Sequence, residues 1–172
     1  MNGSRIVAFY SGQAPDDRGR SLAELQAQSL DALEYNHDYI QWLFPLPERS
    51  SANPGAPLLS PADIRAFADS AALRGNLLRS LSAMLRFYGL ELFESAGGVE
   101  IRPADAFAQR SRVWLTPYNH NFLRITRILR SLTLLACGEH ADALLECLEG
   151  IYREHHALIG PETFRYWKTA RS

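Results

Sequence analysis

The sequence NHNFLRITRILRSLTLLACG, residues 119–138, decides the fold that we expect for this chain. Thr116-Pro117 comes just before it, and proline suits the first turn of a helix because its φ is already helical and its missing N–H is not needed there. Gly138 is suited to end the helix, since glycine adopts the left-handed cap conformation at little cost. Between them, apolar side chains recur at helical spacing on a broad face: Phe122, Ile125, Ile128, Leu129, Leu132, Leu135 and Ala136. Leu123 and Leu134 lie on the other side, so the sequence predicts a central helix over about 117–137 that is packed on several sides.

Length and composition indicate one soluble domain. The chain has 172 residues, of which 47% are hydrophobic and 22% charged, and this is enough for a single core. The net charge of −1, from 18 basic and 19 acidic side chains, gives no overall attraction to nucleic acid or to an anionic membrane. The sequence has no secretory signal and no run near the roughly 18 apolar residues that span a bilayer. Cys137 and Cys147 are expected to be buried thiols in a reducing compartment, which favours a cytoplasmic protein.

The remaining patterns predict further helices, with two exceptions. Residues 6–10 are expected to lie extended against the core. LELFESAGGVEIR predicts a small β-hairpin near 90–102, because two apolar segments flank Gly97-Gly98. Gly75 is expected to bend or split the long third helix, and Gly89 to end it. The expected helices cover about 22–35, 39–44, 61–88, 103–113, 117–137, 139–156 and 161–168. The prediction is therefore a mainly α, multi-helix bundle that forms a single domain over residues 1–172.

Motifs of common enzyme classes are missing from the sequence. There is no G-x-S-x-G elbow, no P-loop and no H-E-x-x-H pair of metal ligands. Cys137 with His140, and His155 with His156, are not followed by a second pair at the spacing of a zinc site. We therefore expect no metal and no cofactor.

Arginines on the central helix form the first candidate site. Arg124, Arg127 and Arg130 share one side of the helix, at positions i, i+3 and i+6. Asn121, with Asn119 and His120, lies at the N-terminal end, where free N–H groups favour anions. This combination would suit a peptide carboxylate, a phosphate or another acidic ligand. The alternative is that the arginines pair with acidic side chains of neighbouring helices and that the asparagines cap the helix.

A second polar cluster precedes the proline-rich connector over residues 45–61. His37 and Asp38 could act as an acid–base pair, with Gln41 on the same helical face as Asp38 and with Trp42 beside it. The alternative is an ordinary helix cap followed by one packed polar residue.

Two stretches resemble a known family. His37 to Pro45 reads HDYIQWLFP and Asn121 to Leu129 reads NFLRITRIL, and both closely resemble the shared domain of the opioid growth factor receptor family. We refer to residues 37–45 as the first block and to residues 121–129 as the second block. Met84 to Gly89, MLRFYG, and Phe9-Tyr10 are also similar to this family. The resemblance covers residues 9–168, and the length of the chain suggests a single-domain, bacterial member.

The resemblance implies a binding function. Animal members are described as receptors for the peptide Met-enkephalin that are nuclear or perinuclear and linked to growth inhibition. The resemblance supplies no catalytic residues. We therefore expect a binding module for a peptide or small acidic ligand, with a groove walled by Trp42, Tyr39 and Trp114 and with exposed arginines. The expected ligand-binding residues are His37, Asp38, Gln41, Trp42, Asn121, Arg124 and Arg127.

Two other classes of function stay open. The first is an enzyme in which His37, Asp38 and Arg124 converge on one pocket. The second is an interaction scaffold or homo-oligomer, which exposed apolar surface on the last two helices would support. Neither requires nucleic acid or a membrane as a partner.

Overall fold

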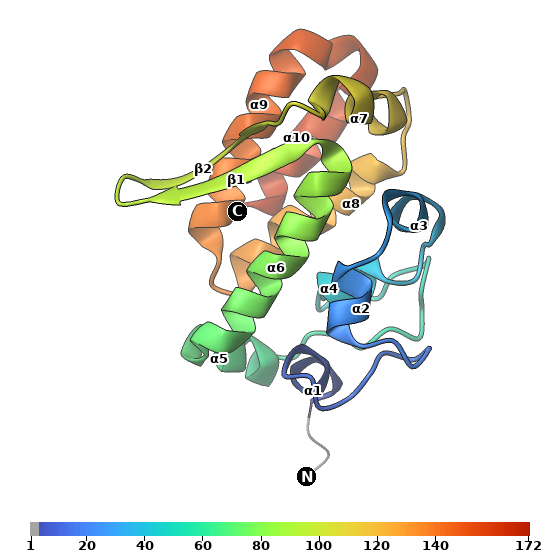
Figure 1. Cartoon of the computed structure of the whole chain (residues 1–172), viewed down its shortest axis with the longest axis vertical. Coiled ribbons are helices and arrows are strands. Elements are labelled where there is room, and N and C mark those ends of the chain that lie inside the picture. Colours follow the sequence, from blue (N-terminus) through green and yellow to red (C-terminus); the bar gives the residue numbers. More distant parts are fainter. Residues whose placement is uncertain (1–3) are drawn as a thin grey trace.

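The computed structural model describes residues 4–172 and shows a mainly helical molecule with one β-hairpin (Figure 1). This confirms the predicted fold class. The N-terminal half contains short helices followed by one long helix: α1 (Arg5–Tyr10), α2 (Leu22–Gln26), α3 (Leu30–Tyr35), α4 (Ile40–Leu43), α5 (Pro61–Asp69) and α6 (Ala71–Tyr88). The hairpin and four helices follow: β1 (Leu90–Ser95), β2 (Gly98–Pro103), α7 (Phe107–Trp114), α8 (Asn121–Leu134), α9 (Gly138–Ile159) and α10 (Pro161–Ala170).

Local hydrogen bonds explain where the N-terminal helices differ from the prediction. Residues 6–10 are helical and not extended, because Ser4 caps α1 by accepting a hydrogen bond from the Val7 N–H. The predicted helix over 22–35 is two helices, since Ser29 has an extended backbone and caps α3. The predicted helix over 61–88 is divided at Ser70 and not at Gly75. Ser70 has φ −118° and ψ 106°, and its side chain caps α6.

The central helix α8 is shorter at both ends than predicted. Pro117 lies in a turn before the helix, and Tyr118 after it has a φ of 58°. At the other end, Ala136 occupies the left-handed position with a φ of 60°, and the Cys137 N–H donates to the Leu132 carbonyl at 2.9 Å. This is the hydrogen-bond pattern of a Schellman cap, here closed by alanine. Gly138 therefore begins α9 and does not end α8.

The hairpin is confirmed, with β1 and β2 antiparallel and Ser95 paired with Gly98 at the turn. Gly89 ends α6 as predicted, with a φ of 76°. A Cβ at this position would lie 2.8 Å from the Phe107 Cα, so glycine is required for space as well as for conformation. This close approach lets α7 pack against the end of α6. α7 starts at Phe107, later than the predicted 103.

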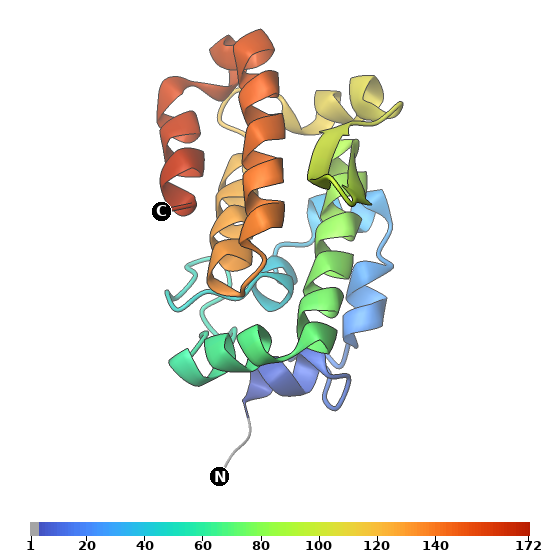
Figure 2. The ribbon, with the colours of Figure 1, turned by 90° about the vertical axis from the view of Figure 1, so that its left-hand side faces the viewer.

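Helix α8 lies inside the molecule, as predicted. It packs against α9 and α10, and its other side carries hydrogen bonds to residues 33–45. Figures 1 and 2 show α6 and α9 running along the length of the molecule, with α5 crossing one end and the hairpin projecting sideways. One hydrophobic core joins all of these layers, and it includes Phe9, Phe44, Leu81, Leu129 and Trp167. The N-terminal segment is thereby held against α8, where the two blocks meet.

Candidate functional site

Arg124 joins the second block to the end of α3, directly before the first block, through main-chain carbonyls. Its side chain is only 5% exposed, yet among residues 4–172 no carboxylate forms an ion pair with it. Instead its Nη1 donates to the Leu33 carbonyl at 2.7 Å and its Nη2 donates to the Asn36 carbonyl, also at 2.7 Å. These carbonyls belong to the last turn and the C-cap of α3, where a helix leaves acceptors unpaired. Arg124 therefore acts as a C-terminal cap of α3, and its charge suits that end of the helix dipole.

The next polar residues of α8 contact the end of α4 in the same way. Arg127 Nη1 donates to the Phe44 carbonyl at 2.9 Å, and Ser131 Oγ donates to the Pro45 carbonyl at 3.0 Å. Phe44 is the C-cap of α4. The two blocks are thus bound together by side chains of the second block and of Ser131 beyond it, which satisfy the backbone of the first.

Several predicted site residues have partners within the fold. Asn121 is fully buried, and its Nδ2 donates to Glu34 Oε2 at 3.0 Å. Asp38 forms ion pairs with Arg18 at 2.5 Å and Arg20 at 3.2 Å. Asn119 Oδ1 accepts a hydrogen bond from the N–H of Asn121, the first residue of α8, at 2.9 Å. Asn119 lies one residue before His120, the N-cap of α8, and the N-cap itself has no hydrogen bond from its side chain.

The predicted aromatic groove is wrong, because its three walls are core residues. Tyr39, Trp42 and Trp114 are 0%, 2% and 0% exposed. Tyr39 donates its hydroxyl to the Leu33 carbonyl, and burial raises the pKa of this hydroxyl to about 12. Trp114 donates its indole N–H to the Tyr88 carbonyl. These rings support the two blocks from inside.

A pocket of about 390 Å³ lies over the junction of the two blocks. It is bounded by α4, the outward face of α8 and the start of the connector. Four of the seven predicted binding residues line it: His37, Gln41, Arg124 and Arg127. Asp38, Trp42 and Asn121 are not part of its lining. Its other lining residues are Ile40, Leu46, Arg49, Ser50, Ser51, Ala52, His120, Leu123, Thr126 and Arg130. We call this the block pocket.

The block pocket is strongly basic. Four arginines line it, and no Asp or Glu is among the described residues of its wall. Arg130 pairs with Glu48 at 2.7 Å, whereas Arg127 bonds only to the Phe44 carbonyl among the residues that the structure describes. Burial lowers the pKa of Arg127, an effect that Glu48 partly opposes. Since arginine stays charged throughout the accessible pH range, Arg127 presents a partly desolvated cation with unused donors.

Two histidine rings lie at one end of this pocket. His37 and His120 are in edge-to-face contact, with ring centroids 5.2 Å apart. Arg124 Nη2 lies 3.2 Å from His37 Nδ1, and because arginine only donates, this nitrogen is the acceptor. Partial burial lowers the pKa of His120, and the positive charge of Arg124 lowers it further. Glu34 opposes this shift.

The connector residues of the pocket were not predicted. Arg49, Ser50, Ser51 and Ala52 have no periodicity that would place their side chains. Gln41 Nε2 donates to Ser50 Oγ at 3.2 Å and so ties this wall to α4. The only signal in the sequence was the resemblance itself, which extends through this loop. The predicted convergence of His37, Asp38 and Arg124 is not observed, because Asp38 is directed to Arg18 and Arg20.

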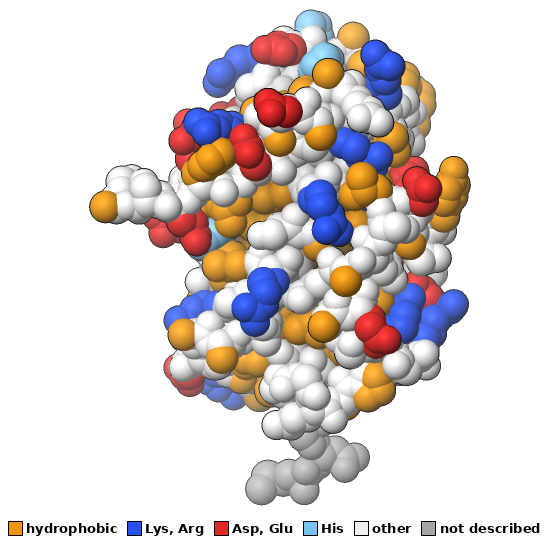
Figure 3. Space-filling view, viewed as in Figure 1, with side chains coloured by type: hydrophobic (Ala, Val, Ile, Leu, Met, Phe, Trp, Pro, Cys, Tyr) orange, Lys and Arg blue, Asp and Glu red, His pale blue; other side chains and the backbone are white. Residues whose placement is uncertain are grey.

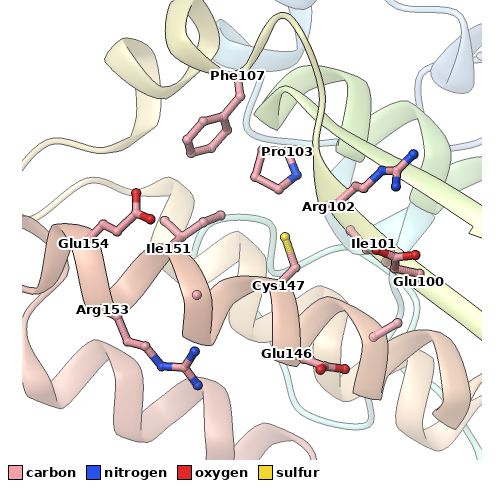
Figure 4. Close-up of a pocket in the computed structure, with 12 residues that line it drawn as sticks. Glu100, Ile101, Arg102, Pro103, Phe107, Glu146, Cys147, Ile151, Arg153 and Glu154 are labelled. Atoms are coloured by element: carbon pink, nitrogen blue, oxygen red, sulfur yellow. The ribbon is translucent and has the colours of Figure 1, made fainter.

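A second pocket, of about 480 Å³, lies between β2 and α9 (Figure 4). Its walls carry charges of both signs, including Glu100, Arg102 and Arg153, and Figure 4 shows Cys147 directed toward Pro103. Burial raises the pKa of the Cys147 thiol to about 12, so it is protonated at neutral pH and a poor nucleophile. Charges of one sign do not predominate in this pocket, whereas they do in the block pocket.

The described residues contain neither a metal-binding cluster nor a helix that could span a membrane. Within residues 4–172, no three His, Cys, Asp or Glu side chains are grouped so that they could hold a metal ion. His140, which the sequence placed near Cys137, contacts Glu94 at 2.7 Å. None of the helices described is both long and apolar enough to cross a bilayer. On the face seen in Figure 3, basic and acidic side chains are interspersed, without a broad area of one sign.

Comparison with known proteins shows the family of this chain. The model of the family described as the opioid growth factor receptor (OGFr) conserved region matches residues 7–170. The chain belongs to this family. Both blocks, and every residue that lines the block pocket, lie inside the matched range.

Several vertebrate proteins are similar to this chain. The opioid growth factor receptor of Rattus norvegicus is 44% identical over 143 residues, which cover 81% of this chain and 24% of the relative. That of Mus musculus is 44% identical over 115 residues, covering 67% and 18%. The opioid growth factor receptor-like protein 1 of Xenopus tropicalis is 39% identical over 130 residues, covering 73% and 25%. The chain thus spans a quarter or less of these relatives. No solved structure matches it.

Proposed function

We propose that this chain is an OGFr-like binding module that takes a peptide or small acidic ligand in the block pocket. The observation that carries the proposal is the charge of this pocket. Arg49, Arg127 and Arg130 reach it, and Glu48 is paired with only one of them. An anionic group of a ligand would form charge-assisted hydrogen bonds there, which are stronger than neutral ones. The relatives are named as receptors, which agrees with a binding role.

Arg127 is the residue on which the proposal depends most. Arg124 has five hydrogen-bond partners within the fold and contributes mainly its charge. Arg127 has its Nε and Nη2 groups available, and its partial burial limits the screening of its charge. Gln41 and Thr126 add polar groups to the same wall.

The test is the binding of a tetraglutamate peptide, measured by isothermal titration calorimetry at low salt. Replacing Arg127 by glutamine, R127Q, should weaken binding at least about tenfold, because one charge-assisted interaction is worth about 1.5–3 kcal/mol. The matched control is R65Q on α5, because Arg65 is exposed and does not line the block pocket. Circular dichroism checks that both variants are folded. Equal binding by R127Q and R65Q, or no binding by the unmodified chain, would show that the block pocket is not the site.

A further inference from the structure

The edge of β2 that faces away from β1 borders the second pocket, of about 480 Å³. Four residues that follow one another along the strand line this pocket: Glu100, Ile101, Arg102 and Pro103. Successive side chains of a strand point to opposite faces of the sheet. Since residues of both faces border one pocket, the pocket lies along the edge of the strand, which Figure 4 shows beside α9. We call it the edge pocket.

The hydrogen bonds of the hairpin leave main-chain groups of this edge unpaired. The Ala104 N–H donates to the Gly89 carbonyl at 2.9 Å, so the neighbouring pair of the ladder, at Pro103, is a non-hydrogen-bonded one. The two kinds of pair alternate along an antiparallel ladder, and the N–H and carbonyl groups of Val99 and Ile101 therefore point away from β1. Among residues 4–172, no main-chain group outside the ladder bonds to these four groups.

Unpaired main-chain groups are unfavourable where water has little access. Ile101 is only 5% exposed, yet its N–H and its carbonyl have no partner in β1. Buried groups of this kind are paired in nearly all proteins. A third strand along β2 would pair them, together with those of Val99. Pro103 can accept a hydrogen bond but cannot donate one, so the edge that a third strand can use ends there.

Helix α9 supplies an apolar floor beside this edge. Ala143, Cys147 and Ile151 are buried apolar residues that line the edge pocket. Gly150 lines it too, and a Cβ there would meet no atom within 4 Å. Glycine is unfavourable inside a helix relative to alanine, and neither the packing nor the backbone of α9 requires it at this position. Gly150 instead keeps the floor of the edge pocket open.

The charges around the edge pocket favour a basic ligand. Five charged side chains line it: Glu100, Arg102, Glu146, Arg153 and Glu154. Within the described part of the chain, Arg102 pairs with Glu91 at 3.8 Å, whereas the three glutamates form no ion pair. Figure 4 shows Arg153 on the side of α9 away from Phe107. The unpaired charge beside the edge is therefore mainly negative, which is complementary to a basic side chain.

We propose that the edge pocket is a site of β-strand addition, in which an extended, basic segment of a partner protein pairs with β2 above α9. The segment runs antiparallel, since antiparallel pairs are the more stable. Five residues cover the edge, with the first opposite Pro103 and the fifth opposite Val99. The N–H groups at positions one, three and five point to β2, and the side chains at these positions face α9. Position four lies opposite Glu100 and carries the basic side chain.

Main-chain pairing of this kind supplies affinity, and alternate side chains supply specificity. The site is separate from the block pocket and does not rest on the function proposed for it. None of the residues that line one pocket lines the other.

The probe is the pentapeptide VTVKV in one-letter code, acetylated and amidated, added to the isotope-labelled full chain and followed by NMR. At saturation, solvent exchange of the Val99 and Ile101 amides should slow at least about fivefold, because they gain hydrogen bonds. The Glu100 and Arg102 amides, already paired with β1, should gain no protection. N-methylation of the probe at position three should weaken binding at least about tenfold, since it removes an N–H that points to β2. N-methylation at position four, where the N–H points away, should have little effect.

The charge at position four has its own test. The probe VTVEV, with glutamate in place of lysine, should bind at least about threefold more weakly than VTVKV, because like charges opposite one another repel. In Glu100→Gln this difference should shrink. The matched control is Glu149→Gln, because Glu149 is also on α9 but does not line the edge pocket. The control should keep the difference.

The shape of the pocket is tested with Gly150→Leu, which places a side chain on its floor. VTVKV should bind at least about tenfold more weakly to this variant. Gly75→Leu is the matched control, because Gly75 also has open space in a helix interior and lies outside the edge pocket. Leucine favours helix more than glycine does, so both variants should fold, as circular dichroism checks.

Several outcomes would overturn the proposal. No binding of VTVKV by the unmodified chain, or unchanged binding by Gly150→Leu, would show that the edge pocket is not a site. Equal effects of the two N-methylations would show that the ligand does not add a strand. If the Val99 and Ile101 amides are already protected in the free chain, and protection rises with protein concentration, the edge is covered by a second copy and not by a partner protein.

Discussion

At the scale of single residues, the guanidinium of Arg124 supplies hydrogen bonds that the last turn of α3 cannot form for itself. The sequence raised the question of what such a cation does in a helix that is otherwise apolar. Its partners are the carbonyls of Leu33, Glu34 and Asn36, with Asn121 Oδ1 and His37 Nδ1 beside them. A buried charge is tolerated when its hydrogen bonds are complete, and here the backbone completes them.

Replacing Arg124 by methionine should therefore reduce stability strongly. Among the residues that the structure describes, the Asn36 carbonyl would lose its donor, and the Leu33 carbonyl would keep only the hydrogen bond from the Tyr39 hydroxyl. We expect a decrease in the free energy of unfolding of about 3 kcal/mol or more. Arg124→Lys should recover only part of this, because an ammonium group cannot reproduce the planar fork. Urea denaturation measures both values. A loss below about 1 kcal/mol in Arg124→Met would show that Arg124 is not the main connection between α8 and the end of α3.

At the scale of elements, patterns of apolar residues predicted which segments are helical but not where they end. The hairpin, Gly89 and the α8–α9 pair were all predictable, because their signals lie within a few residues. The ends of α8 were not, since Tyr118 and Ala136 adopt positive φ without being glycine. Local propensity assigns such conformations to glycine, and only the surrounding structure imposes them on other residues.

The same limit applies to the candidate site. The polar residues of both blocks were visible in the sequence, and four of the seven named line the block pocket. The sequence could not show that Trp42 points into the core or that Asp38 pairs with Arg18, because these depend on which side of α4 faces the molecule. The sequence could not place Arg49 and the neighbouring loop residues at the site, since an irregular segment has no periodicity from which side-chain directions can be inferred.

Two glycines of α6 should respond in opposite ways to alanine. Gly75 lies in the middle of the helix, with open space where a Cβ would project, so Gly75→Ala should stabilise the protein by about 0.5–1 kcal/mol. Gly89 has a φ of 76° and no room for a Cβ beside Phe107. Gly89→Ala should destabilise it by more than about 2 kcal/mol. Thermal unfolding of the two variants provides a direct comparison. Similar changes of the same sign would mean that the end of α6 is not held as tightly as the structure indicates.

At the scale of the whole molecule, stability should fall on the acidic side in two stages. The pKa of His120 is lower in the folded chain than its usual value of 6.5, owing to burial and then to Arg124. The unfolded chain therefore binds this proton more readily, and the contribution of neutral His120 is lost as the pH falls from 6.5 through the lowered pKa. The second stage involves carboxyl groups. Burial alone would raise the pKa of the Asp16 carboxyl, but hydrogen bonds from Arg20 and Arg18 lower this pKa below its usual value. A hydrogen bond from Arg130 likewise lowers the pKa of Glu48.

The first stage can be isolated with His120→Gln. We expect the free energy of unfolding of the unmodified chain to decrease between pH 7 and pH 5, and the decrease to be smaller in His120→Gln, which cannot take up this proton. The second stage, below about pH 4 where ordinary carboxyl groups titrate, should be the same in both. Urea denaturation at a series of pH values gives the two curves. Parallel curves between pH 7 and pH 5 would exclude His120 as a source of the dependence.

The hairpin has a practical consequence for experiments on this protein. Its turn, around Ser95 to Gly98, projects away from the helices in Figure 1, and neither β1 nor β2 takes part in the block pocket. Exposed turns tolerate insertions better than packed segments do. A fluorescent label or an affinity tag placed in this turn would leave the junction of the two blocks untouched. The chain could then be immobilised or observed through the hairpin while its ligands are identified from complex mixtures.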